Sequence, residues 1–165
     1  MSKESTEEQK EKIIKSLNEE FIEKALKIFN DAKNNKVGNK IEKLSYRKVD
    51  AEEAKKLKDK TGLDLEGYEH NITNMDVRHI YKNHGDERSE SFRGQRAVTE
   101  KDILLIPEIT ENYDDAMLAD KKNKSTNLDA IIYRKRIGDE FFYIETVSGQ
   151  KSKELRSVTM WIVKK

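Results

Sequence analysis

All three histidines of the chain, His70, His79 and His84, lie within one 15-residue stretch. Histidine is the side chain best suited to moving protons near neutral pH. His79 and His84 are five residues apart, which is about 140° around a helix, so they do not lie directly above one another. His84 precedes Gly85, where a helix is expected to end, and a helix C-terminus favours an imidazolium. Two interpretations remain open, namely satisfied packing positions or a pair of proton-transfer groups.

The same stretch does not indicate a metal site. Zinc proteases need histidines at i and i+4 with an adjacent glutamate, whereas Asn83 stands four residues after His79. The chain has no Cys, which excludes a disulfide scaffold, a cysteine zinc site and a thiol nucleophile. We therefore expect neither a metal ion nor another cofactor.

Arg93 and Gln95 follow in the segment SESFRGQRAVT, on either side of Gly94. A glycine lets the backbone approach a ligand closely, and the fork of an arginine suits phosphate oxygens. These residues are therefore candidates for binding substrate. An ordinary turn with solvated side chains is the alternative.

Three segments near the end, LDAIIYRKRI, EFFYIETVS and SVTMWIV, have the β-branched and aromatic composition of strands. Alternation puts Tyr133 and Lys135 on one side of the first segment, and Ser157 and Thr159 on one side of the third. A sheet face with these four side chains would be polar and cationic, which suits a nucleic-acid backbone. A solvated face without a ligand is the alternative.

Helices come first and strands come last, an order that predicts an α+β fold with helices packed on a small antiparallel sheet of about four strands. We expect a helical extension over residues 1–36 and a domain over 37–165. The extension contains one amphipathic helix over 5–35, which either packs on its own domain or connects to an upstream segment or a second copy. The other expected elements are a strand over 39–49 and helices capped by Asp50, by Thr73 or Asn74, and by Thr99. We expect Pro107 to kink the last of these helices or to split it into two short pieces. A polar mobile loop over 114–127 and a three-stranded meander follow.

Length and charge limit the class of protein further. The chain has 165 residues, which predicts about one domain, and its apolar runs are far shorter than the roughly 20 residues of a membrane span. The start is polar, so no secretory segment is indicated. The net charge of +1 hides a segregation: 6 basic and 14 acidic residues in 61–120 give −8, and 11 and 5 in 121–165 give +6. The basic end suits a phosphate-binding surface, or is a solvated lysine-rich face.

The order TGLDLEGYEHNI, DVRHIYKNHGDE, RGQRAVTEKDI, LIPEI, IIYRKRIGDEFFYIETV and SVTMWIV resembles the phage-type barnase–EndoU–colicin–RelE-like nuclease domains. Such domains occur at the C-termini of phage head-morphogenesis proteins and polymorphic toxins. The resemblance covers roughly residues 40–165. It implies a metal-independent ribonuclease toxin that acts on cytoplasmic RNA, tRNA included, and is delivered with a phage particle or a secreted toxin. It also implies a cognate immunity protein or antitoxin, no membrane partner, and a delivery region upstream of residues 5–35.

The resemblance suggests His79 and His84 as general base and acid, in either order, and Thr159 as the late strand hydroxyl. The residues present suit RNA transesterification, in which the 2′-OH attacks the adjacent phosphorus and leaves a 2′,3′-cyclic phosphate. Arg93 and Lys135 are then candidates for phosphate charge, and Tyr133 for a hydrogen bond to phosphate oxygen. Gln95 and Ser157 complete the expected substrate contacts. The alternatives are an inactive module that binds RNA or protein, a structural head-morphogenesis or oligomerisation part, and a deoxyribonuclease.

Overall fold

The chain adopts the α+β fold that the order of its sequence patterns predicts. The structure is a computed structural model that describes residues 6–33 and 41–164. Within these ranges the helices are α1 (Thr6–Lys15), α2 (Glu19–Lys33), α3 (Ala51–Thr61), α4 (Asn74–His84), α5 (Glu87–Phe92), α6 (Glu100–Leu104) and α7 (Ile106–Glu111). The strands of the same ranges are β1 (Lys43–Lys48), β2 (Glu69–Thr73), β3 (Gln95–Arg96), β4 (Asp115–Leu118), β5 (Ala130–Ile137), β6 (Asp139–Val147) and β7 (Glu154–Val163).

The strands form one sheet in the order β1-β2-β7-β6-β5-β4, and β3 pairs with the far end of β7. The antiparallel meander of β5, β6 and β7 is confirmed. The expectation of about four antiparallel strands is wrong, because the sequence patterns do not reveal the short strands β2, β3 and β4. β2 pairs with β7 in parallel, and β1 joins the meander only through β2.

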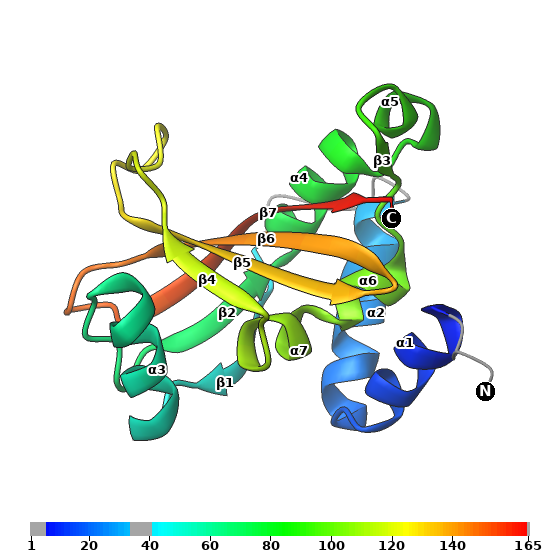
Figure 1. The fold of residues 1–165 in the computed structure, drawn as a ribbon. Helices are drawn as coiled ribbons and strands as arrows, with labels where there is room; N and C mark the ends of the chain where they lie inside the picture. The colour runs from blue at the N-terminus through cyan, green and yellow to red at the C-terminus, as the bar shows by residue number, and fades with distance from the viewer. Residues whose placement is uncertain (1–5, 34–40, 165) are drawn as a thin grey trace, which may run out of the picture.

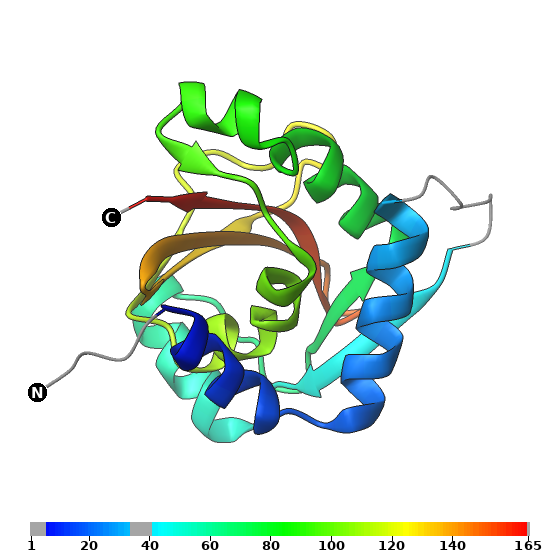
Figure 2. The same ribbon diagram turned by 90° about the vertical axis from the view of Figure 1, so that its right-hand side faces the viewer.

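The sheet is strongly curved, and its concave side closes over α6 and α7. Figure 2 shows the strands curving around these two helices, and Figure 1 shows α1 and α2 on the same side. α4 lies along β7 and packs on α2, with the rings of Tyr81 and Phe29 5.8 Å apart. Beyond it α5 rises beside the end of β7, and the loop between β4 and β5, residues 119–129, rises beside β4 (Figure 1). The sheet therefore has one face packed on a core and one face framed by a helix pair and a loop.

The expected single helix over 5–35 is wrong, because the chain breaks at Asn18. The Asn18 side chain accepts hydrogen bonds from the backbone N–H groups of Glu20 and Phe21, at 2.9 and 3.3 Å, and so begins a second helix. The apolar side of α2 is buried in the common core, with Phe29 at 4% exposure. This helix therefore packs on the rest of its own chain. The expected helix end at residues 34–38 lies outside the described residues.

The other helix boundaries follow their capping residues. Asp50 caps α3, and Thr73 and Asp76 form a capping box at the start of α4. Pro107 stands in the first turn of α7, so the expected split is confirmed. The expected polar loop over 114–127 is partly wrong, since Asp115–Leu118 pairs with β5 as β4. None of the helices in residues 6–33 and 41–164 combines the length and apolar character needed to cross a bilayer.

A β-bulge in β7 decides which of its side chains face the core. Ser157 pairs with Glu145 and Thr159 pairs with Ile144, so Val158 is an extra residue between the two pairs. An extra residue reverses the alternation beyond it. Ser157 is consequently 3% exposed on the packed face, whereas Thr159 lies on the opposite face. The expected common face for Ser157 and Thr159 is therefore wrong.

Candidate active site

The sheet surface that points away from the core carries apolar and aromatic side chains, and we call it the open face. Trp161 pairs with Phe142, which in turn pairs with Arg134 on the next strand. The Phe142 and Trp161 rings stack, with centroids 5.2 Å apart and planes 7° from parallel. The next row along the strands consists of Met117, Ile132, Ile144 and Thr159.

His84 lies at one border of the open face and is held by a buried carboxylate. Its Nδ1 is 3.2 Å from Oε2 of Glu90, which is 0% exposed, and its ring centroid is 6.4 Å from that of Trp161. A carboxylate at Nδ1 fixes the ring orientation and keeps the proton on that nitrogen. Within the described residues Nε2 of His84 has no hydrogen-bond partner. The arrangement thus suits His84 for proton transfer at Nε2.

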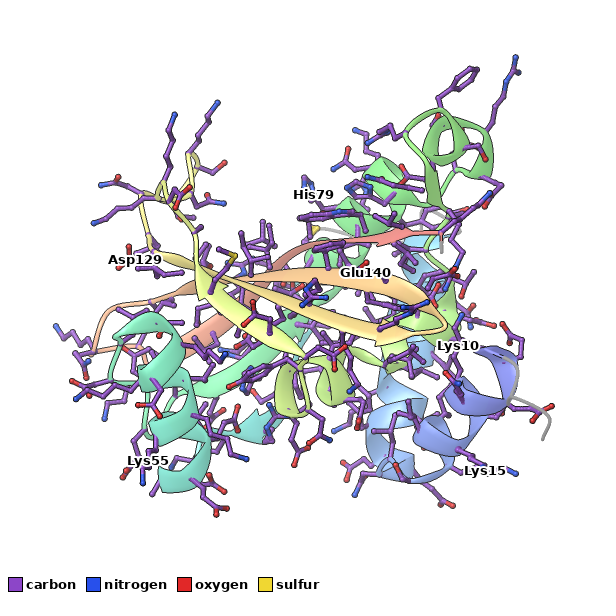
Figure 3. All side chains as sticks on the ribbon, viewed as in Figure 1. Lys10, Lys15, Lys55, His79, Asp129 and Glu140 are labelled. Atoms are coloured by element: carbon purple, nitrogen blue, oxygen red, sulfur yellow. The ribbon has the colours of Figure 1, made fainter. Side chains whose placement is uncertain are left out.

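His79 is exposed on the same helix and lines a cleft on the open side. Figure 3 shows it projecting from α4 on the side of the sheet that carries the 119–129 loop. The cleft has a volume of about 290 Å³. Its other lining residues are Asp76, Asn123, Ser125, Thr126, Thr146, Arg156, Ser157 and Val158. The guanidinium of Arg156 is half-exposed and lies 3.6 Å from Asp76, so a cation is available beside His79.

The two histidines flank the same strand but do not line one pocket. α4 runs along β7, with Asp76 beside Arg156 at its start and His84 beside Trp161 at its end. The cleft of His79 is not lined by His84. A substrate that contacts both rings must therefore extend along β7, where Thr159 lies between Arg156 and Trp161 on the open face.

Arg93 and Gln95 do not line the cleft of His79 and lie instead near the end of α4. Arg93 is half-exposed, and its Nη2 is 3.3 Å from Oε1 of Glu90. Gln95 pairs with Val163 in β3, and its side-chain oxygen is buried without a hydrogen-bond partner among the described residues. Arg93 is thus close to the His84–Glu90 pair, whereas Gln95 is held within the sheet edge.

Tyr133 and Lys135 lie on the packed face, which corrects the expected sheet surface. Tyr133 is 0% exposed, and its ring packs 5.7 Å from that of Tyr113. The Lys135 ammonium donates to the carbonyl of Asn112, at the end of α7, over 2.6 Å. Alternation along β5 leaves Arg134 on the open face in their place.

His70 belongs to a buried charge network that sequence reasoning missed. It is 0% exposed, with Nδ1 2.8 Å from Glu145 and Nε2 2.7 Å from Glu53. Arg47 makes two hydrogen bonds of 2.9 Å to Glu53, and the Tyr46 ring stacks on His70 at 5.4 Å. These residues come from β1, β2, α3 and β6, so no pattern within a short stretch of sequence predicts the cluster.

The network favours the charged form of its histidine. Burial alone lowers the pKa of His70, but the Glu145 carboxylate and the hydrogen bonds to Glu145 and Glu53 raise it above its usual value. Burial likewise raises the pKa of Glu53, yet hydrogen bonds from His70 and Arg47 bring it down to about 2. Since His70 is fully enclosed, it cannot touch a substrate, and we assign it a structural role.

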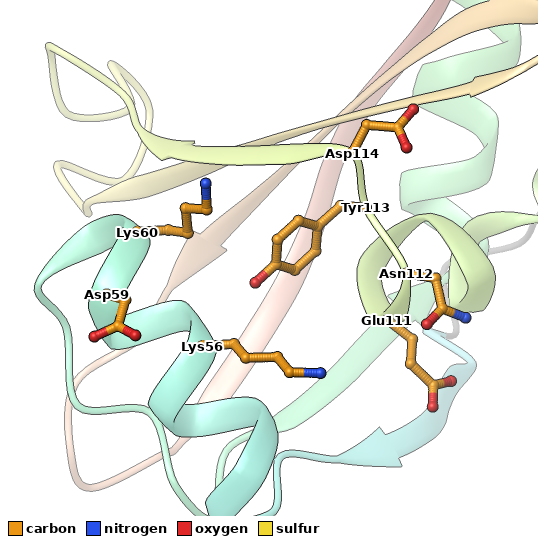
Figure 4. Close-up of a pocket in the computed structure, with 7 residues that line it drawn as sticks. All are labelled: Lys56, Asp59, Lys60, Glu111, Asn112, Tyr113 and Asp114. Atoms are coloured by element: carbon orange, nitrogen blue, oxygen red, sulfur yellow. The ribbon is translucent and has the colours of Figure 1, made fainter.

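A larger cleft beside this network is a weaker candidate. It has a volume of about 500 Å³ and lies between α3 and the end of α7, with Tyr113 between the lysines and Glu111 (Figure 4). The lining residues are Lys56, Asp59, Lys60, Glu111, Asn112, Tyr113 and Asp114. The two lysines face three carboxylates and no histidine, so this cleft offers a polyanion neither net positive charge nor a proton-transfer pair.

Residues 6–33 and 41–164 contain no group of three or more His, Cys, Asp or Glu side chains arranged to hold a metal ion. The site consists instead of a histidine on a carboxylate, a second histidine, and arginines beside an aromatic sheet face. The side chains of this site, carried on an α+β fold, have the chemistry to transfer protons at a charged substrate.

The chain belongs to the phage-Barnase-EndoU-ColicinE5/D-RelE like nucleases, because the model of the third family in that group matches residues 47–165. The resemblance in the sequence is thereby confirmed, and the chain is a nuclease by family. No curated protein and no solved structure matches it. Both histidines of α4, together with Glu90 and Trp161, fall inside the matched region.

Proposed function

We propose that this nuclease is a metal-independent endoribonuclease that cuts RNA by transesterification. The observation that carries the proposal is the His84–Glu90 pair, in which a fully buried carboxylate holds Nδ1 of a histidine beside the aromatic open face. RNA supplies its own nucleophile, so the chemistry requires proton transfer and charge stabilisation from the protein.

In the proposed reaction Nε2 of His84 takes the proton of the 2′-OH. The 2′-oxygen forms a bond to the adjacent phosphorus, the bond from phosphorus to the 5′-oxygen breaks, and His79 donates a proton to that oxygen. The products are a 2′,3′-cyclic phosphate and a 5′-hydroxyl end. Glu90 stabilises the imidazolium that forms on His84.

Three further residues have proposed roles around the phosphate. The guanidinium of Arg156 and the hydroxyl of Thr159 stabilise the charge that develops on the nonbridging oxygens. Arg93 binds the neighbouring phosphate, supported by its ion pair with Glu90. The five-residue spacing of His79 and His84 separates them by about 7.5 Å along the helix axis and about 140° around it, so in this proposal the RNA runs along β7 to reach both rings.

The test is cleavage of a defined RNA strand in EDTA, with analysis of the end groups. We expect a 2′,3′-cyclic phosphate from RNA and no cleavage of the matched DNA strand, which lacks the attacking hydroxyl. His84→Ala and His79→Ala should each slow cleavage by about 10²- to 10⁴-fold. The exposed residue Lys58 lies on α3, away from the open face, and Lys58→Ala serves as the matched control. Cleavage of DNA, or wild-type rates in both histidine variants, would contradict the proposal, and RNA binding without products would select an inactive binding module.

We further propose that the nuclease acts as a toxin on cytoplasmic RNA and is neutralised by an immunity protein or antitoxin. Support comes from the family, whose description joins phage proteins with colicin- and RelE-like nucleases. Induced expression in a bacterial host should arrest growth, and His84→Ala should relieve the arrest. Growth at the uninduced rate despite accumulation of active protein would contradict a toxin role.

A further inference from the structure

We propose that Phe142 and Trp161 form the base-binding site of this nuclease, on which an unpaired nucleobase next to the cut bond stacks. The inference rests on the proposed function and adds what binds the substrate. A flat ring is bound by other flat rings, and stacking on aromatic side chains is how proteins hold splayed single-stranded bases.

The first argument is the position of the ring pair. Phe142 and Trp161 stand directly opposite each other on β6 and β7, with nearly parallel planes, and both are partly exposed. The imidazole of His84 is the next ring along this row, at 6.4 Å from Trp161. A base on this pair therefore places its own sugar and phosphate within reach of the histidine that we assign as base.

The second argument is the division of the open face into an apolar floor and a charged border. The neighbouring row of Met117, Ile132 and Ile144 is also apolar, and Met117 is 51% exposed although it lies in a strand. A solvent-facing antiparallel sheet surface is commonly polar, so this floor is unusual for a face without a ligand.

The border supplies the complementary charge for phosphates. Arg134 lies next to Phe142 on β5, with its guanidinium half-exposed and one hydrogen bond of 2.9 Å to Glu140. Arg156 lies at the opposite end, in the cleft of His79. The 119–129 loop adds the exposed lysines Lys121 and Lys124. An arrangement with bases on the apolar floor and phosphates at the charged border fits single-stranded RNA. It does not fit a duplex, whose bases are stacked on each other.

Tryptophan fluorescence tests this inference directly, because Trp161 is the only tryptophan of the chain. Its fluorescence reports on the proposed site alone. The probe is a short RNA with a 2′-O-methyl group at every nucleotide, which cannot form the cyclic phosphate and so remains uncut. We expect saturable quenching of Trp161 by this RNA, and no quenching by an oligonucleotide of the same length that lacks bases.

Variants separate stacking from simple packing. Phe142→Leu keeps an apolar side chain but removes a ring, and should weaken binding about 5- to 150-fold, the range expected for one lost stacking contact. Trp161→Leu should weaken binding similarly in fluorescence anisotropy with a labelled RNA, and Trp161→Phe, which retains a ring, should restore most of the affinity. Phe92 is 86% exposed on α5, outside the open face, and Phe92→Leu is the matched control.

Each outcome of these experiments either supports or overturns the stacking site. Quenching with loss of affinity in Phe142→Leu supports the stacking site, even if the same protein cuts no RNA, in which case the proposed catalysis alone fails. Equal affinity in wild type, Phe142→Leu and Trp161→Leu, all folded by circular dichroism, overturns the stacking site while leaving the cleavage reaction intact. Binding without any change in Trp161 emission, or no binding of the RNA, also overturns it.

Discussion

Replacing His70 with leucine tests how the buried charges of this fold are balanced. The change removes the group that lies 2.8 Å from Oε2 of Glu145, a residue with no exposed surface. Glu53 keeps its two hydrogen bonds from Arg47, but Glu145 keeps only hydroxyl neighbours such as Tyr46, 3.4 Å away. The variant therefore leaves one buried carboxylate without a cation, which is the costly way to break a buried pair.

The expected loss follows from that single uncompensated charge. Removing one partner of a buried ion pair costs about 3–5 kcal/mol of stability. Each kcal/mol lowers the Tm of a protein of this size by about 2–4 °C, so His70→Leu should lower it by about 6–20 °C. The double variant His70→Leu with Glu145→Met replaces the pair with apolar groups of similar volume and should recover most of the loss.

The assay is thermal and urea unfolding followed by circular dichroism at neutral pH. His79→Ala, at an exposed position, is the control and should change stability by no more than about 0.5 kcal/mol. Because the pKa of His70 is raised, its contribution is full below pH 6.5 and declines as pH rises through the raised value, so the effect should shrink in alkaline buffer. A loss within the control margin, or a double variant as unstable as the sum of its singles, would refute the reasoning.

The site, the acid response and the helix of the two histidines give three further predictions. Glu90→Gln should slow RNA cleavage by about 10²- to 10⁴-fold in initial-rate assays, since His84 loses the carboxylate that orients it, and an unchanged rate would remove Glu90 from the mechanism. Glu53, with its pKa lowered from 4.5 to about 2, contributes stability that is present above pH 4.5 and lost as pH falls toward 2. Urea midpoints should fall over that window less steeply in Glu53→Gln than in wild type, and equal slopes would contradict this. Thr73→Ala removes the side chain that accepts from the Asp76 N–H over 3.1 Å, and should cost about 0.5–2 kcal/mol in urea unfolding, a cost that Thr73→Ser should largely avoid.

Local signals in the sequence predict much of the fold. Asp50 and Thr73 begin helices where their capping patterns indicate, and Pro107 separates α6 from α7. The composition of the three final strands predicts the meander. In each case the cause lies within a few residues of its effect, which is why one sequence is enough to see it.

The errors have causes that are not local. Val158 reverses the alternation of β7, and only the pairing with β6 reveals that it is extra. The short strand β2 ends at the helix cap Thr73 and pairs with a segment more than 80 residues later, so a short window of sequence indicates only the helix. His70 meets Glu145 across β7, because β2 and β6 flank that strand, so the segment YEHNI alone does not indicate its surroundings. The sequence indicates the two histidines of α4 as candidates for proton transfer. It does not indicate that the carboxylate of Glu90 supports one of them.

The pairing of β7 also bears on when this nuclease becomes competent. β7 follows every other described element in the chain and is the strand that joins β6, β2 and β3. It also carries Trp161 and Thr159 of the open face and Arg156 of the cleft, so a nascent polypeptide whose β7 is still inside the ribosome lacks the strand that joins its sheet and these side chains. Synthesis from the N-terminus therefore completes the sheet and the Trp161 surface only after β7 has emerged.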